Sequence, residues 1–299
     1  MDLREYQRRA QETDRNPSNT EEGLIVPLLG LAGEVGTLLS DYKKKLRDRD
    51  TYRLFKENVA EELGDILWYV ANVATKFGLE IDEIARLNLK KTRERFLRED
   101  ISECTNPYLL FDEGAPPEEQ FPRQFSVEFT QQMQGKTAAV FLKWNGHIIG
   151  NRLTDNAYAD DGYRFHDVFH LSYAAILGWS PVMRKLMGRK RRSQPKVDEV
   201  EDGGRSTVIE EGISAYVFSY AADHDFLQNS QTLDYELLRT IKKLTANLEI
   251  RERSTAQWEQ AILTGYHVWH EMRSHEGGTV HVDMIKRTLT FSPTTNTHR

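Results

Sequence analysis

Apolar residues recur at every third or fourth position along neighbouring segments of the chain between Leu28 and Phe96. This spacing is the period of an α-helix that buries one of its faces. The stripe of the first segment consists of Leu28, Leu31, Ala32, Val35, Leu38 and Leu39. The stripe of the second segment consists of Ile66, Tyr69, Val70, Val73 and Ala74. The pattern predicts two long helices that run antiparallel across a short loop.

Four helices are predicted in this part of the chain, over residues 2–13, from Pro27 to about 47–50, over 52–77 and over 81–96. Pro27 is expected in the first turn of the second helix, where a missing backbone N–H leaves no hydrogen bond unmade. Gly78 is expected to end the third helix, because glycine readily adopts the left-handed conformation that closes many helices.

The helical pattern then stops, and the acidic, proline-bearing stretch over 101–122 is predicted to be a linker between two domains. Strand-forming residues follow in FSVEF and AAVFLKWNGHIIGNRL, where Asn145-Gly146 suits a tight hairpin turn. Helical patterns return over residues 163–177, 208–222, 235–248 and 255–272, the last opened by a Ser254–Gln257 capping box. The prediction is a mainly α protein, with an all-α domain over 1–100 and a mostly helical α+β domain over 123–299 that contains a small antiparallel sheet.

Composition narrows the class of protein. With 299 residues, 39% hydrophobic and 29% charged, the chain has the length and balance of a soluble two-domain protein. The charged N-terminus lacks a signal peptide's apolar core, and no run approaches the roughly 18 apolar residues of a membrane span, so we expect a cytoplasmic protein without membrane contact. The single cysteine, Cys104, excludes an internal disulfide, and the net charge of -6 argues against general nucleic-acid binding.

Three carboxylates lie beside the apolar stripes. Glu62 and Asp65 are three residues apart and so leave the same helix face, one turn from each other, while Glu34 lies on the flank of the preceding stripe. On facing helices these acids would provide three hard oxygen ligands, which suit Mg²⁺ or Mn²⁺. The alternative is that they belong to solvated faces beside lysine and arginine.

The segments YQRRAQET, GLAGEVG, EELGDILWYVANVA and GLEIDEIARLNLKKTRERF together resemble the MazG-like nucleotide pyrophosphohydrolases across the first hundred residues. The resemblance implies an all-α enzyme that cleaves nucleoside triphosphates to monophosphate and pyrophosphate, with Mg²⁺ held by ExxE and ExxD motifs. The ExxD motif falls on Glu62 and Asp65, and the first acid of ExxE falls on Glu34. Thr37 stands in the second acid's place, so one ligand is missing or is supplied by a neighbour such as Asp41, and activity is expected to fall.

The resemblance also implies contacts with the nucleotide and with other copies of the chain. Asn88 and Lys91 match the family's NxxK motif, which is expected to contact phosphates. Lys43 either assists electrostatically or stabilises the end of its helix, and Trp68 either stacks on a base or packs in the core. Glu61 is a candidate to orient water, although its side chain points about 100° away from that of Glu62. Dimers or higher homo-oligomers are implied as well.

A second set of potential ligands lies in the other half of the chain. His166, Asp167 and His170 form HDxxH, which places both imidazoles on one helix face, as in zinc-binding HExxH. Glu210 or Glu211 could supply a third ligand for Zn²⁺. The alternative is that the histidines merely form hydrogen bonds.

Other residues of this half have competing interpretations. Glu210 also fits a capping box with Thr207, and His267 and His270 form another histidine pair. The basic run Arg189–Arg192, followed by acids over 198–202, predicts either a mobile surface loop or a phosphate-binding lid.

Two functions from different classes follow from these residues. The first is Mg²⁺-dependent hydrolysis of a nucleoside triphosphate or related nucleotide to monophosphate and pyrophosphate. The second is a nucleotide-sensing or interaction protein with a degenerate first domain, which Thr37 favours. A metal-dependent hydrolase that uses the HDxxH histidines is a further alternative for the second domain.

Overall fold

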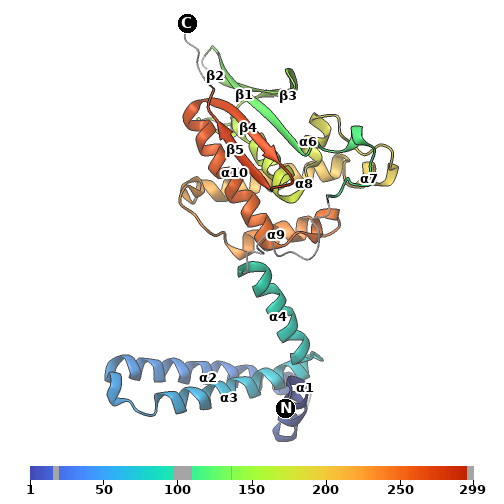
Figure 1. Ribbon diagram of the computed structural model, residues 1–299. Helices are drawn as coiled ribbons and strands as arrows, with labels where there is room; N and C mark the ends of the chain where they lie inside the picture. Colours follow the sequence, from blue (N-terminus) through green and yellow to red (C-terminus); the bar gives the residue numbers. More distant parts are fainter. Residues whose placement is uncertain (16–19, 97–109, 136, 295–299) are drawn as a thin grey trace. The chain divides into compact units, whose positions relative to one another are not determined.

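The computed structural model describes residues 1–15, 20–96, 110–135 and 137–294. It divides into two compact domains, residues 1–93 and 94–299 (Figure 1). Each domain is considered by itself below. The predicted fold class is confirmed, because a helical first domain is followed by a mainly helical second domain with one antiparallel sheet.

The first domain contains four α-helices, as the apolar periodicity predicts. They are α1 (Leu3–Ala10), which continues into a 3₁₀ turn at Gln11–Thr13, α2 (Glu21–Asp48), α3 (Phe55–Lys76) and α4 (Ile81–Phe96). The predicted position of Pro27 is wrong, since α2 begins six residues earlier and Pro27 lies inside it. The earlier start follows from Thr20, whose hydroxyl accepts a hydrogen bond from the backbone N–H of Gly23 and so caps the helix.

The turn between α3 and α4 is closed by backbone and side-chain hydrogen bonds. Gly78 follows the end of α3 with a φ of 67°, as predicted, and the N–H of Leu79 donates to Ala74 O at 2.8 Å. Gln7, on α1, donates to Leu79 O at 2.8 Å and accepts from the N–H of Ile81 at 2.9 Å. One buried side chain of α1 therefore links the end of α3 to the start of α4.

The core of the first domain is small and much of its apolar surface is uncovered. Its buried apolar residues are Ala10, Ala71, Ala74 and Ile81, with Leu3, Tyr6 and Trp68 packed against them. Large apolar side chains on α2, α3 and α4 remain exposed, including Leu29, Leu39, Leu46, Leu63, Leu67 and Leu87. Exposed apolar surface of this extent on one set of helices is typical of an interaction face.

No apolar run long enough to span a membrane is expected from the sequence, and α2 corrects this expectation. The stretch Gly23–Thr51 is long and apolar enough to cross a membrane, with a window of mean hydropathy 1.6 of which 11% is buried in this chain. Length and composition alone are weak grounds for a membrane span, because a helix of a soluble oligomer can have the same properties.

The second domain contains a five-stranded antiparallel sheet with strand order β3-β2-β1-β4-β5. The strands are β1 (Gln124–Gln134), β2 (Thr137–Trp144), β3 (His147–Leu153), β4 (Gly277–Asp283) and β5 (Thr288–Ser292). Asn145 and Gly146 form the predicted hairpin turn with φ angles of 50° and 79°. Strands β4 and β5 were not expected from the sequence; β4 pairs with β1 from the far end of the chain, and β5 pairs with β4.

The helices described in the second domain are α5 (Asp167–Ser172), α6 (Pro181–Leu186), α7 (Pro195–Val200), α8 (Gly204–Ala222), α9 (Tyr235–Leu244) and α10 (Thr255–His275). Of these, α5 and α10 pack against strands of the sheet (Figure 1). The capping box at Ser254 and Gln257 is confirmed. The continuous helix predicted over 163–177 is wrong in detail, because α5 lies between a 3₁₀ turn at Tyr163–Phe165 and a π-helix at Tyr173–Leu177.

The segment from residue 110 onward belongs to the second domain, which makes its start earlier than predicted. Leu110 and Phe121 are buried in its core. Asp112 is buried as well, where it accepts from Arg184 at 2.8 Å and from the N–H of Phe121. Residues 110–122 of the predicted linker are therefore packed, while 101–109, with Cys104, lie outside the described residues.

The basic run is not a mobile surface loop, because Arg191 is buried. Its guanidinium lies 2.7 Å from Asp202 and 2.7 Å from Glu249, and its backbone N–H also donates to Asp202. Pairing on two sides compensates for the loss of water around the charge. The run thus fixes the segment before α8 in place.

A substitution at Gly30 tests the close approach of α2 and α3. A Cβ at Gly30 would overlap the ring of Tyr69, whereas a Cβ at Gly33 has nothing within 4 Å. We expect Gly33→Ala to stabilise the helix by about 0.5–1 kcal/mol. Gly30→Ala should lie about 1–3 kcal/mol below Gly33→Ala in the free energy of unfolding, because the ring must move. Denaturant unfolding of both variants checks this, and equal stabilities would show that the contact is not tight.

Candidate active site and a histidine cluster

The acids of the predicted metal site lie on α2 and α3, which run side by side (Figure 1), but their oxygens are not all within 4.8 Å of one another. Glu34 is half-buried on α2, Glu62 is half-buried on α3, and Asp65 is exposed one turn after Glu62. Burial raises the pKa of the Glu62 carboxyl, and the charges of Glu34, Asp41 and Asp65 raise it further. The structure therefore brings the three predicted carboxylates close enough for their charges to interact.

Glu62 lacks compensation for its charge. Its Oε2 atom is buried and has no hydrogen-bond partner among the described residues. No lysine or arginine in the described part of the chain forms an ion pair with Glu34, Glu62 or Asp65. A buried carboxylate oxygen beside two further acids fits a divalent cation with hard oxygen ligands.

Thr37 adds no charge to this group. Its side chain is exposed and donates back to Gly33 O at 3.3 Å. Asp41 is buried but already accepts from Lys44 at 2.7 Å and Tyr52 at 3.0 Å. The hydrogen bond from Lys44 lowers the pKa of Asp41. Both hydrogen bonds are accepted by Oδ1, and the charge of Asp41 also acts on Glu62, so Asp41 stays a candidate for the missing ligand.

The remaining predicted contacts are distributed over three helices. Trp68 is half-buried, and its Nε1 donates to Thr13 at 2.8 Å, which favours its packing role. Lys43 on α2, Glu61 on α3, and Asn88 and Lys91 on α4 are exposed. These four side chains are accessible to a solute.

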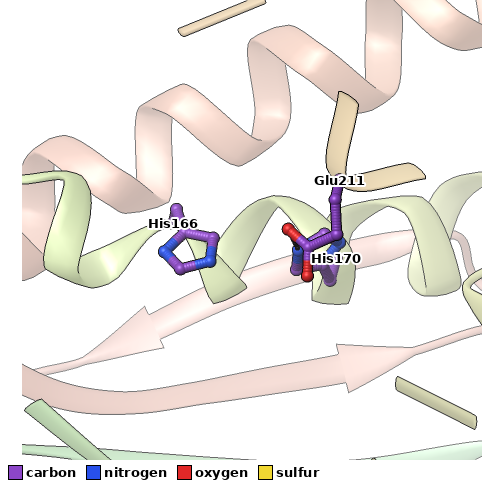
Figure 2. Close-up of side chains that lie close together, drawn as sticks. All are labelled: His166, His170 and Glu211. Carbon is purple, nitrogen blue, oxygen red and sulfur yellow. Dashed lines mark ion pairs between the residues drawn. The ribbon is translucent and has the colours of Figure 1, made fainter. Parts of the chain in front are cut away.

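The histidines of the second domain form a cluster with one of the two predicted acids. His166, His170 and Glu211 place one potential ligand atom each within 4.8 Å of the others, and no other such group is found in the described ranges. Figure 2 shows the Glu211 carboxylate directed toward His170, with His166 one turn earlier along the chain. Glu210 instead contacts the opposite side of His170, through Nδ1 at 2.8 Å.

Two competing interpretations in this half are wrong or weakened. The Thr207–Glu210 capping box is absent, because α8 begins at Gly204 with Gly203 as its N-cap. His270 is engaged with Phe226 O at 2.9 Å, and His267 is exposed. They do not join the cluster.

Asp167 is a potential functional residue that the sequence analysis treated only as part of a motif. Its Oδ1 lies 3.3 Å from Nε2 of His166 and 3.9 Å from Nε2 of His170. Its proximity to both rings follows from its place within HDxxH at the start of a helix. The hydrogen bonds that Glu210 accepts from Ser180 and Val182, at the start of α6, could not be foreseen from the local sequence.

A domain of packed helices whose facing surfaces carry carboxylates without cationic partners defines an all-α class of protein. Comparison with known proteins identifies the family. A family model described as the MazG nucleotide pyrophosphohydrolase domain matches residues 27–96, and one described as the MazG C-terminal domain matches residues 106–295. The chain belongs to the MazG nucleotide pyrophosphohydrolase family, which confirms the resemblance found in the sequence.

The chain is also similar to a viral protein. Gene 37 protein of Mycobacterium phage L5 is 33% identical over 96 residues, which are 30% of this chain and 84% of that protein. No solved structure matches the chain. The family is typically dependent on divalent metal ions.

Glu62→Gln should stabilise the first domain at neutral pH when no divalent cation is present. Because the pKa of Glu62 is raised on folding, the folded state keeps its proton at pH values where the unfolded state has lost it. The wild type therefore loses stability as pH rises from the unfolded pKa through the folded pKa, and glutamine does not. The difference should vanish in acid, where the carboxyl is protonated in both states.

Calorimetry of the full chain over a pH series measures this difference. Glu57→Gln, which changes an exposed acid at the start of α3, is the matched control. A Glu62→Gln effect that is independent of pH, or a loss of stability at neutral pH, would show that the ionised Glu62 carboxylate does not destabilise the fold.

Proposed function

We propose that the first domain hydrolyses a nucleoside triphosphate, or a related nucleotide, to the monophosphate and pyrophosphate. The observation that carries this proposal is the buried, unpartnered oxygen of Glu62 between Glu34 and Asp65. Acids arranged in this way repel one another unless a cation joins them, so their position is costly to the fold by itself. The family match supports the choice of a nucleotide as the substrate.

Glu34, Glu62 and Asp65 would hold the cation, and their all-oxygen donor set favours Mg²⁺ or Mn²⁺ over softer metals. Such an ion would neutralise charge on phosphate oxygens and activate water for attack on phosphorus. Lys91 and Asn88 would bind the phosphates from α4. Glu61 would orient the attacking water by accepting its hydrogen bond.

The alternative, a protein that binds nucleotides without efficient turnover, rests on Thr37. Thr37 brings no negative charge, and Asp41, the nearby acid that could replace it, shares its Oδ1 with Lys44 and Tyr52. With three carboxylates instead of four, a second cation would be bound less tightly. Turnover is therefore expected to be slower than a complete ExxE motif would allow.

We further propose that the first domain pairs with another copy of itself, as a dimer or higher homo-oligomer in the cytoplasm. Leu29 and Leu39 on α2 and Leu63 on α3 are more than half exposed. Their burial against a second copy would remove from water a surface that the small core of this domain leaves open.

Asp65→Asn should lower the rate of pyrophosphate release by roughly 100-fold or more, because it removes a negative ligand from the cation while keeping the size of the side chain. The assay is pyrophosphate release from a panel of nucleotides with Mg²⁺, using the full chain. Glu57→Gln is the control, because it removes an exposed acid on the same helix. Inorganic phosphate as the product would contradict the proposed bond.

Thr37→Glu separates the two candidate functions in the same assay. If the domain is an enzyme limited by the missing carboxylate, this change should raise the rate or the affinity for Mg²⁺. Binding of nucleotide without pyrophosphate release by both the wild type and Thr37→Glu would establish the sensing function instead.

Leu39→Lys should shift the protein to a smaller oligomer without unfolding it, because the side chain is 60% exposed in the single chain and only a partner would bury the charge. Ile285→Lys in the second domain is the matched control, since Ile285 is 62% exposed. Light scattering at micromolar concentration measures the mass. A monomeric wild type, or an unchanged mass for Leu39→Lys, would count against pairing through this face.

A further inference from the structure

The cluster in the second domain is built from two helices that converge on one point. His166 precedes α5 directly and His170 lies within it, one turn later. Glu211 comes from the second turn of α8, which packs against α5. The three side chains bring two imidazole nitrogens and a carboxylate oxygen within 4.8 Å of one another.

Hydrogen bonds at the other ring nitrogen fix the tautomer of each histidine. Nδ1 of His166 lies 2.9 Å from Tyr163 O, a carbonyl that can only accept, so Nδ1 carries the proton. Nδ1 of His170 lies 2.8 Å from the Glu210 carboxylate and donates to it in the same way. In both neutral rings the lone pair is therefore on Nε2, the atom that faces the shared space.

Glu210 is held in a way typical of a carboxylate that orients a metal-binding histidine. It is completely buried, and it also accepts from the Ser180 hydroxyl at 2.6 Å and from the N–H of Val182 at 2.8 Å. Ser180 caps the start of α6. Hydrogen bonds from Ser180, Val182 and His170 thus hold the Glu210 carboxylate at Nδ1 of His170.

His170 provides the observation that calls for a ligand. The side chain is fully buried, yet its Nε2 has no hydrogen-bond partner in the described part of the chain. The nearest acids are Glu211 at 3.4 Å and Asp167 at 3.9 Å. Buried polar atoms are nearly always satisfied, so an unpaired nitrogen between two carboxylates indicates a missing partner.

His166 is held by an aromatic neighbour, and the cluster is accessible to solvent at Glu211. The ring of Tyr163 stacks on His166 with centroids 4.4 Å apart and planes 6° from parallel. Glu211 is 43% exposed, so an ion or small molecule can reach the cluster along its side chain.

We propose that His166, His170 and Glu211 bind one divalent transition-metal ion, with Zn²⁺ as the best fit, and with Asp167 beside it as a further oxygen donor. Imidazole nitrogens favour Zn²⁺ over Mg²⁺, which distinguishes this site from the carboxylate group of the first domain. Three protein ligands leave a coordination position for water or a small ligand.

The competing account is an ion network without metal. The charge of Glu210 and its hydrogen bond, together with the nearby carboxylates of Glu211 and Asp167, raise the pKa of His170 despite its burial, so an imidazolium could be held between these acids. That account gives Nε2 of His170 a proton and predicts no metal uptake. The two accounts differ in a measurable stoichiometry.

The experiment is calorimetric titration of Zn²⁺ into the full chain after removal of metals with a chelator, with excess Mg²⁺ present. Co²⁺ titration followed by its visible absorption is a second readout of nitrogen ligation. The Asp65→Asn protein tests whether the first domain takes up the ion. His267→Gln, at an exposed histidine of α10, is the matched control.

One equivalent should bind to the wild type, Asp65→Asn and His267→Gln, and both His166→Gln and Glu211→Gln should lose about tenfold or more in affinity. Thermal unfolding checks that the variants are folded. If His166→Gln is not folded, Glu211→Gln alone tests the site, because the partly exposed Glu211 can be changed with less effect on folding. No uptake by the wild type, unchanged binding by both variants, or loss in Asp65→Asn would overturn the site. Since binding is measured in Asp65→Asn, the result does not depend on pyrophosphate release.

Discussion

Repulsion among the carboxylates of α2 and α3 is the constraint on which the first domain depends. Glu62 has a buried oxygen without a partner, and Glu34 and Asp65 add negative charge beside it. The two helices nevertheless pack closely, because Gly30 on α2 leaves room for the ring of Tyr69 on α3. Such a cost is understandable where a cation and a polyphosphate complete the site, because both compensate charges that the side chains alone do not.

The second domain shows how the same chain treats buried charge when the purpose is structural. Arg191 is paired with Asp202 and Glu249, and Arg184 is paired with Asp112, so these charges are satisfied within the fold. The contrast separates charged groups that are paired within the fold from those that are not. Charges with partners on all sides fix a segment in place, whereas Glu62 and His170 retain unsatisfied atoms and are the atoms that a ligand would complete.

Local patterns predicted those parts of the fold that local interactions determine. The helices and the Asn145-Gly146 hairpin depend on neighbours a few residues away, and the structure has them. The predicted stripes are not buried as such, because Leu28, Val35 and Leu39 are exposed. The pairing of β4 with β1, and the burial of Arg191 by Asp202 and Glu249, depend on partners that the local sequence does not reveal. The sequence pointed to both Glu210 and Glu211 as possible ligands but did not distinguish their roles. Adjacent helical side chains point about 100° apart, so the two acids reach different sides of His170.

The position of bond cleavage tests the account most directly. Phosphorus NMR of a nucleoside triphosphate incubated with the full chain and Mg²⁺ resolves every phosphorus-containing product in one spectrum. The account predicts that the signals of the triphosphate are replaced by those of the monophosphate and pyrophosphate together, in equal amounts. A spectrum that develops nucleoside diphosphate and inorganic phosphate, or that remains unchanged while nucleotide is bound, would contradict it.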